Sequence, residues 1–313
     1  MKRIFLLLSI CCVLGTLQAQ QDHQYTQFMY NKLFLNPAYA GARGVPNVTA
    51  IYRNQWIGFD GAPQSALISV NTPFITPRVG MGVTVSTEQI GLQRDFYGAL
   101  AYSYDLLVKD EISLRMGIQG SFRNVGFDFS EADPNDVFDN SLNDMRTTET
   151  SGNVGAGLYA TFVDQFYLGF SAPHIYSNVI GLNPDPNVTT AEEALHLYGM
   201  AGAILPIGED INLMPAVLTK YVKNAPFDVE LNVNLDIKET ITAGVSYRLG
   251  GNGPGESISL LAYWQIAPQF GLGASYDFPL TDVKDFSAGS IEALVSVDLK
   301  KTKKKMSNPR FFL

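Results

Sequence analysis

A chain of 313 residues with a mean hydropathy of +0.04 is too polar to be a bundle of transmembrane helices. Charged residues make up only 17% of it and aromatic residues 12%, which suits a protein that faces an apolar environment in addition to its own core. The net charge of −8 argues against a nucleic-acid partner, because a surface that binds phosphates is basic.

Residues 1–19 have the composition of a secretory signal peptide. Lys2 and Arg3 form a charged start, an apolar stretch follows, and Ala19 is a small residue at the expected cleavage site. Both cysteines of the chain lie inside this leader. The exported chain is therefore expected to have no disulfide bond, no thiol nucleophile and no cysteine metal site.

Residues 20–46 lack the pattern of a strand. Their hydrophobic side chains recur at roughly helical spacing, and Asn36-Pro37 ends the run. We expect a short N-terminal segment that lies in the periplasm, or that plugs or lines the mouth of a barrel.

From residue 48 onward, apolar and polar residues alternate, which indicates β-strands. Soluble strands average about five or six residues, whereas several of these segments reach the roughly nine to eleven that a tilted membrane strand needs. We therefore predict an all-β fold, a transmembrane antiparallel outer-membrane β-barrel of about fourteen strands over residues 47–299. The strands are expected near residues 47–57, 64–74, 79–88, 92–107, 110–124, 151–163, 165–172, 194–206, 210–222, 226–237, 239–250, 256–267, 269–279 and 285–299.

The connections between these strands alternate in length. The even-numbered ones are short, beginning with Pro77-Arg78, while the two long ones, 125–150 and 173–193, are both odd-numbered. Outer-membrane barrels have short periplasmic turns and longer extracellular loops. The two long connections are therefore predicted to be extracellular. Pro215 lies inside a predicted strand and weakens that assignment.

Residues 300–313 form a basic tail that contains five lysines and Arg310. The tail is expected to lie in the periplasm, because an even number of strands returns the chain to the side on which it began. Arg310, Phe311 and Phe312 are candidate partner-docking residues, since aromatic side chains beside arginine are typical binding anchors. A disordered end and a recognition signal for barrel insertion remain alternatives.

The sequence gives little support for an enzyme. The histidines, His23, His174 and His196, are far apart and have no metal-ligand spacing, so no metal site is expected. There is no Gly-x-Ser-x-Gly nucleophile motif, and the glycines at 152, 155 and 157 do not precede a helix. We expect no catalytic residue and no cofactor.

Polar side chains recur on one face of the predicted strand at 226–237. Outer-membrane barrels have a polar interior, so these residues are candidates for lining the lumen. They are Asp228, Glu230, Asn232 and Asp236.

Two stretches resemble a known family. Residues 24–29 lead into Asn-Pro-Ala-Tyr-Ala-Gly at 36–41, and Tyr-Arg-Asn-Gln-Trp-Ile-Gly-Phe at 52–59 leads into Gly-Ala-Pro at 61–63. With these stretches the chain resembles the PorP/SprF family of the type IX secretion system of Bacteroidota. The family motif residues are Asn36, Pro37, Tyr39, Gly41, Arg53, Gln55, Trp56, Gly58, Gly61 and Pro63.

The resemblance implies an integral outer-membrane component that supports secretion or surface retention of a large adhesin-type cargo protein, in some members for gliding motility. Its partners would be outer-membrane lipid, periplasmic components of the secretion system and the adhesin. No catalytic residue comes with the family. The alternative is an outer-membrane channel for small or apolar solutes. The motif also has a purely structural interpretation, because its glycines and Pro63 are turn formers and Trp56 suits a membrane-interface girdle.

Overall fold

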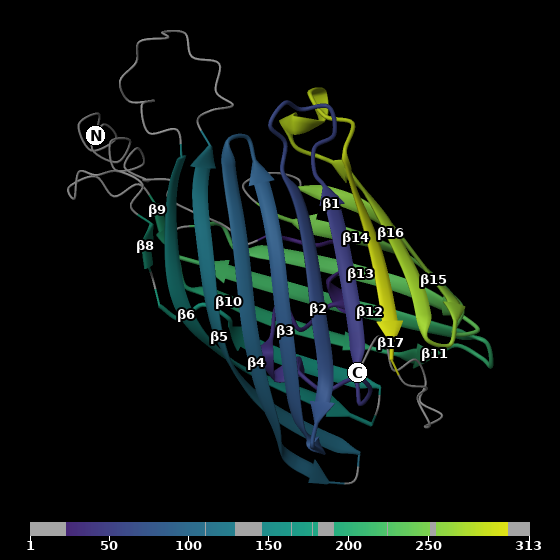
Figure 1. Ribbon diagram of the computed structural model, residues 1–313. Coiled ribbons are helices and arrows are strands. Elements are labelled where there is room, and N and C mark those ends of the chain that lie inside the picture. The colour runs from purple at the N-terminus through teal and green to yellow at the C-terminus, as the bar shows by residue number, and fades with distance from the viewer. Residues whose placement is uncertain are drawn as a thin grey trace, which may run out of the picture.

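The computed structural model describes residues 23–109, 111–128, 146–163, 165–176, 178–180, 191–223, 225–250 and 255–299. Within these ranges the chain forms a closed antiparallel β-barrel of 14 strands, which confirms the predicted fold (Figure 1). The barrel strands are β1 (Asn47–Asn54), β2 (Gln64–Phe74), β3 (Thr76–Ile90), β4 (Gln93–Lys109), β5 (Ile112–Asp128), β6 (Arg146–Phe162), β7 (Phe166–Ala172), β10 (His196–Ala203), β12 (Ile211–Val222), β13 (Asp228–Ile237), β14 (Ile241–Leu249), β15 (Ser257–Ala267), β16 (Phe270–Pro279) and β17 (Ser290–Asp298).

The first and last barrel strands meet and close the wall. β1 pairs with β17 from Asn47 opposite Asp298 to Asn54 opposite Ile291. The remaining strands pair with their neighbours in chain order, except that β10 joins β7 directly to β12. β8 (Asn178–Ile180) and β9 (Ala191–Glu193) form a separate two-stranded sheet. The short β11 (Leu205–Pro206) belongs to the sheet of the wall, where it pairs with the start of β12.

The alternation along each strand separates an apolar outside from a polar inside. In β13, Leu231 and Val233 are 46% and 43% exposed, whereas the alternating residues Asn232 and Asn234 are each 1% exposed. A water-soluble protein has the opposite distribution. The outer surface is therefore the face that contacts lipid. Among the described residues there is no helix with the length and apolar character needed to traverse a bilayer.

The two ends of the barrel differ in their connections. At the short-turn end, where β1 begins and β17 ends, the links include Ile75 between β2 and β3, and 238–240 between β13 and β14. At the long-loop end the links include 55–63, 129–145 and 280–289, and the last of these holds a short 3-10 helix, η5 (Asp282–Asp285). This separation follows the predicted alternation. The first short turn lies at Ile75 rather than at Pro77-Arg78, because β3 begins at Thr76.

Pro215 is accommodated at a break in the wall. It lies within β12 and pairs with Val233 of β13 on one side. On the other side β10 pairs with β12 only as far as Ala216, and β11 pairs with Leu213 and Asn212. Among the described residues, neither β10 nor β11 pairs with Pro215 on that side, which fits the preference of proline for irregular positions of a sheet.

Residues 23–46, here called the N-terminal segment, lie inside the barrel (Figure 1). The segment holds two 3-10 turns, η1 (Phe28–Tyr30) and η2 (Pro37–Tyr39), rather than a longer helix. At the short-turn end the carbonyl of Pro46 accepts a hydrogen bond from the Leu299 N–H. At the other end His23 contacts Glu88 near the end of β3. The segment therefore runs through the lumen from one mouth to the other.

Candidate functional site in the barrel lumen

The turn at Asn36 places the segment against the barrel wall. The Asn36 side-chain oxygen accepts a hydrogen bond from the Ala38 N–H at 2.9 Å and so caps η2, and Pro37 occupies the first position of this turn. The Asn36 amide donates to the carbonyl of Leu158 in β6 at 2.9 Å. The polar ends of the turn are thereby satisfied by the segment itself and by the wall.

Glycines on the inner wall make room for this turn. A Cβ atom at Gly80 of β3 would overlap the carbonyl of Ala40, and one at Gly117 of β5 would overlap the backbone of Ala38. At Gly157 of β6 it would overlap the side chain of Asn36. The segment thus packs directly on strand backbone, an approach that only glycine permits.

The end of the turn is held by polar side chains of the wall. Gly41 has a φ of +69°, which favours glycine, and its N–H donates to the side-chain oxygen of Asn71 in β2. The Ala40 carbonyl accepts hydrogen bonds from Ser103 and, at 2.9 Å, from the Arg115 guanidinium. Side chains of β2, β4 and β5 therefore bind the backbone of residues 40–41.

An aromatic cluster surrounds a buried lysine in the same region. The ring of Tyr39 packs edge-on against Tyr159, with 5.4 Å between ring centres. The Lys32 ammonium lies 4.4 Å from the centre of the Tyr167 ring and 5.3 Å from that of Tyr39, within the range of cation–π attraction.

A buried charged cluster lies nearer the long-loop end. The Arg53 guanidinium is 2.6 Å from an oxygen of Asp277 and 3.3 Å from one of Glu292, and Arg248 is 3.1 Å from Glu230. All of these side chains are 4% exposed or less. We call this set the charged cluster; it consists of Arg53, Glu230, Arg248, Asp277 and Glu292.

The N-terminal segment completes the charged cluster. The Thr26 N–H donates to Glu292 at 3.0 Å, and the Thr26 hydroxyl donates to Asp277 at 2.9 Å. The Gln27 N–H donates to the other oxygen of Glu292 at 3.0 Å. Hydrogen bonds to ionised carboxylates are stronger than neutral ones, so the segment is fastened to β16 and β17 here.

A second ion pair fastens the segment at the short-turn end. The Arg43 guanidinium donates two hydrogen bonds to the Asp298 carboxylate, at 2.8 and 3.1 Å. Both side chains are 4% exposed or less. Removing one partner of such a buried pair typically costs about 3–5 kcal/mol, because a buried charge remains uncompensated.

The two halves of the family motif meet in this site. Residues 36–41 lie on the lumen wall, and Arg53 contacts the segment through the Thr26 hydroxyl at 3.1 Å. The rest of the motif, residues 55–63, forms the connection between β1 and β2 at the long-loop end. There the Trp56 N–H donates to the Ser290 hydroxyl at 3.1 Å, and Trp56 has a φ of +52°.

Further backbone bonds hold this β1–β2 connection in place. The Gln55 N–H donates to the Pro63 carbonyl at 2.9 Å, and the Gly61 carbonyl accepts from the Gly91 N–H at 2.9 Å. Gly58 and Gly61 have φ values of +92° and +73°, where glycine is favoured. The motif residues thus serve in turns, close contacts or ion pairs of the N-terminal segment, the wall and the β1–β2 connection.

The polar residues singled out on β13 all lie on its inward face. Glu230, Asn232 and Asp236 are 1% exposed and Asp228 is 7% exposed. Glu230 belongs to the charged cluster, and Asp236 accepts a hydrogen bond from the Thr242 hydroxyl at 3.1 Å. Residues 310–312, the candidate docking group, fall outside the described residues.

Sequence reasoning missed the other charged residues of the lumen. Arg248, Asp277 and Glu292 come from three different strands, and no local motif joins them. Their signal was present in the alternation, since each occupies the polar phase of its strand. Such a phase places a side chain inside the barrel without identifying its partner.

Little space remains between the segment and the wall at one point in mid-lumen. A gap beside Tyr25, Phe34 and Tyr198 has a volume of about 10 Å³, which is room for roughly one water molecule. A wider hollow of about 460 Å³ near the long-loop rim is lined mainly by outward-facing residues of β1 to β4, such as Tyr52, Thr87 and Phe96. Inside the barrel, the hydrophobic side chains of the segment are buried in one cluster with those of the inner wall, so the segment packs closely there.

Comparison with known proteins gives one family match and several solved barrels of similar fold. A family model described as "Type IX secretion system membrane protein PorP/SprF" matches residues 17–297. No curated protein sequence matches the chain at a significant level. Among solved structures, the CymD monoaromatic hydrocarbon channel is similar with a TM-score of 0.53 at 12% identity, covering 87% of this chain and 92% of that one.

Two further solved barrels are similar in shape. The monoaromatic hydrocarbon channel TodX, as a deltaS2S3 mutant, has a TM-score of 0.50 at 9% identity, with 90% of this chain and 95% of that one covered. A FadL homologue of Pseudomonas aeruginosa has a TM-score of 0.46 at 15% identity, covering 91% and 96%. At such identities the likeness shows only the barrel fold.

Proposed function

Because the chain belongs to the PorP/SprF family of type IX secretion system membrane proteins, we propose that it supports the secretion or surface retention of a large adhesin-type cargo protein. The family and the barrel place it in the outer membrane. They are those of a membrane component of a secretion system and not of an enzyme. The match over nearly the whole chain is the observation that carries the proposal.

The filled lumen supports a partner-binding role. The N-terminal segment is bonded to β2, β4, β5, β6, β16 and β17 along its path. These bonds hold the segment and the inner wall together as one unit. A barrel of this kind suits a protein that holds a cargo or a neighbouring component. Where the cargo is a motility adhesin, the proposal extends to gliding.

The solute-channel alternative has less support. Its structural basis is the likeness to hydrocarbon channels, which at 12% identity or less concerns only the fold. A conducting path would have to pass the segment, where the gap beside Tyr25 measures about 10 Å³. Purified barrel in a planar bilayer should therefore show no steady ion conductance, and steady conductance would favour the channel.

The basic tail is the proposed contact with the partner. The aromatic and arginine side chains of residues 310–312 follow the last barrel strand, which ends at Asp298 at the short-turn end. That end is the periplasmic one in the proposed orientation. Arg310, Phe311 and Phe312 would therefore be available to a periplasmic component or to the cargo.

Replacing the docking group tests this proposal directly. A triple variant, Arg310→Ala with Phe311→Ala and Phe312→Ala, is compared with the matched triple Lys303→Ala, Lys304→Ala and Lys305→Ala. Each is expressed in a strain that lacks the wild-type chain. Antibody binding to intact cells measures display of the adhesin, and heat-modifiable gel migration measures the folded barrel.

We expect the first variant to lose adhesin display with a normal amount of folded barrel, and the lysine variant to keep it. Loss of the barrel itself would assign the tail to assembly instead. Normal display in a strain without any of this chain would overturn the proposed function as a whole. Recovery of the adhesin with the detergent-solubilised barrel, identified by mass spectrometry, provides a second, independent measure.

A further inference from the structure

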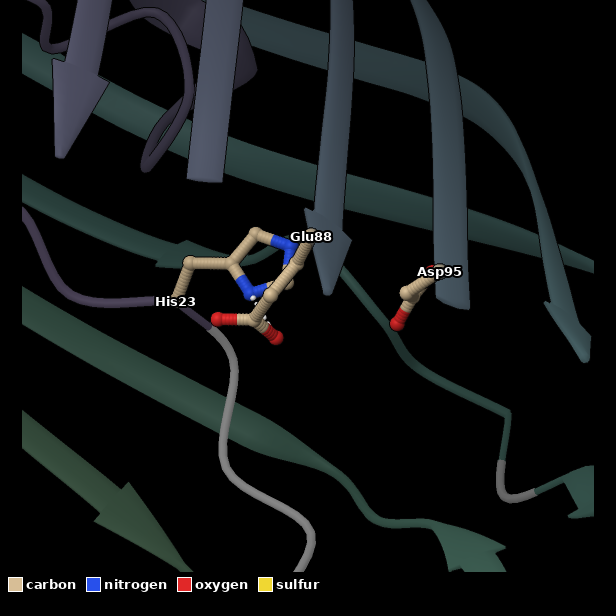
Figure 2. A group of neighbouring side chains, drawn as sticks. All are labelled: His23, Glu88 and Asp95. Atoms are coloured by element: carbon tan, nitrogen blue, oxygen red, sulfur yellow. Dashed lines mark ion pairs between the residues drawn. The ribbon is translucent and has the colours of Figure 1, made fainter. Parts of the chain in front are cut away.

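Three potential metal ligands meet at the long-loop mouth, although they are far apart in the sequence. His23 begins the described part of the N-terminal segment, Glu88 lies near the end of β3, and Asp95 lies near the start of β4 (Figure 2). One ligand atom of each lies within 4.8 Å of those of the other two. Figure 2 shows the His23 ring beside the Glu88 carboxylate, with Asp95 on the neighbouring strand.

The strand pairing forces two negative charges together. Glu88 and Asp95 are directly opposite each other in the β3–β4 ladder and both belong to the inward phase of their strands. Like charges in directly opposed positions destabilise a sheet. A cation between the two carboxylates would relieve this repulsion.

The carboxylates are only partly neutralised by protein groups. The Arg123 guanidinium binds Oδ2 of Asp95, with its Nε at 2.6 Å. The other oxygen, Oδ1, is buried and has no hydrogen-bond partner within the described parts of the chain, and the Asp95 side chain is 2% exposed. An unsatisfied carboxylate oxygen is costly in a buried position. This oxygen is available as a ligand without disturbing the Arg123 pair.

The charge of the site also suits a divalent cation. The two carboxylates are countered by one guanidinium, that of Arg123, so a cation would offset the remaining negative charge. The His23 and Glu88 side chains are 7% and 12% exposed, so the site is not sealed from the mouth. One imidazole nitrogen with two carboxylates is a donor set typical of zinc and related transition metals.

We propose that His23, Glu88 and Asp95 bind a divalent transition-metal cation, with water in the remaining positions, and that the ion ties the N-terminal segment to β3 and β4. Without a metal, the Nδ1 atom of His23 lies 2.8 Å from an oxygen of Glu88, so the three groups are already nearly assembled. The metal replaces that contact with bonds to all three side chains. The ion thereby fastens the segment at the mouth opposite the Arg43–Asp298 pair.

Zinc titration of the purified full-length mature protein tests the site. The protein is extracted from outer membranes in detergent, stripped with EDTA and dialysed, and ZnCl₂ binding is measured by calorimetry. We expect one zinc ion per chain, and at least tenfold weaker binding in His23→Gln and in Asp95→Asn. His174→Gln is the matched histidine control and should bind as the wild type does. Heat-modifiable migration verifies that each variant has a folded barrel.

A thermal readout gives a second measure that does not depend on the calorimetry. Zinc should raise the denaturation midpoint of the wild type and of His174→Gln, but not that of His23→Gln. Absence of zinc binding by the wild type would overturn the proposal and leave an ion pair between His23 and Glu88. Unchanged binding in both His23→Gln and Asp95→Asn would also overturn it, because the zinc would then lie elsewhere.

Discussion

At the scale of single residues, the packing of the N-terminal segment in the lumen depends on glycines of the inner wall. Gly80 and Gly117 allow the backbone of the N-terminal segment to touch the wall, and Gly157 leaves room for the Asn36 side chain. Replacing Gly80 or Gly117 inserts a methyl group where backbone atoms already lie. Backbone atoms cannot turn away as a flexible side chain can, so the segment or the strand must move.

Gly80→Ala should therefore destabilise the protein by roughly 1–3 kcal/mol, the usual cost of overpacking. Gly120→Ala on β5 is the matched control, because a Cβ there would meet nothing within 4 Å. The midpoint of heat-modifiable gel migration measures both. A lower midpoint for Gly80→Ala alone is expected, and equal midpoints would mean that the segment does not press on β3.

The sequence predicted which residues face inward far better than it predicted their partners. The polar phase of β13 identified Glu230 as an inward residue, but its partner Arg248 belongs to the next strand. Arg53 was visible as a motif residue, yet its carboxylate partners lie at 277 and 292. Such pairs depend on the register of strands that meet only when the barrel closes, and no local pattern encodes them.

At the scale of the elements, the strands were predictable because their signal repeats. Alternation over nine or more residues indicates both the strand and its two faces. The expected range 210–222 and the observed β12 (Ile211–Val222) differ by one residue at the start, even though Pro215 lies inside it. The N-terminal segment carries no repeat, so its helical spacing indicated a helix where the structure has two 3-10 turns.

The turn between β13 and β14 offers a test at this scale. Lys238 and Glu239 have φ values of +55° and +52°, and the Thr240 N–H donates to the Ile237 carbonyl, as in a type I′ turn. Non-glycine residues in this region cost roughly 1–2 kcal/mol each. The double variant Lys238→Asn with Glu239→Gly supplies the residues that this turn favours and should stabilise the barrel by about 1 kcal/mol.

A urea titration followed by tryptophan fluorescence measures that gain. Gly208→Ala is the matched control and should lower the stability instead. Gly208 has a φ of +80°, which favours glycine, in another connection at the same end. A barrel that gains nothing from the double variant would argue against a type I′ turn at this position.

The lipid-facing side of β13 makes a second test. Leu231 lies in mid-strand on the outer face and is 46% exposed. An arginine at the middle of the bilayer costs roughly 2–4 kcal/mol, and near the interface about 0–1 kcal/mol. Leu231→Arg should therefore lower folded yield in lipid vesicles strongly. Phe227→Arg, just before the same strand, should lower it little, and equal losses would contradict a depth-dependent lipid environment.

At the scale of the whole molecule, the alternation of short and long connections predicts the orientation. Periplasmic turns are short in outer-membrane barrels, so the long-loop end should face the outside of the cell. The cysteines, Cys11 and Cys12, both lie in the predicted leader, so an introduced cysteine can be labelled selectively. Asp60→Cys should react with an impermeant maleimide on intact cells, and Lys238→Cys only after lysis. The reverse pattern would invert the barrel.

Closure of the wall was predictable from strand number and phase. For residues 20–46 the sequence indicated a plug or lumen segment, with a periplasmic position left open, but not the contacts that such a segment makes. Outer-membrane barrels of this size can enclose water or a plug, and the choice depends on a segment without periodic pattern. The contacts that fill the lumen join residues 26–43 to strands across the entire chain. These contacts follow from side-chain fit and not from hydrophobic periodicity.

The N-terminal segment passes through a barrel that is closed by the pairing of β1 with β17, its first and last strands in chain order. Once β1 and β17 have paired, a segment with the bulk of η2 cannot enter between the strands, and it could leave only by sliding lengthwise. The simplest order is that the segment is in place before the ring shuts. Thr26 and Arg43 bond to carboxylates of β16 and β17. The N-terminal segment would therefore act as an internal template on which β16 and β17 bind before β17 pairs with β1.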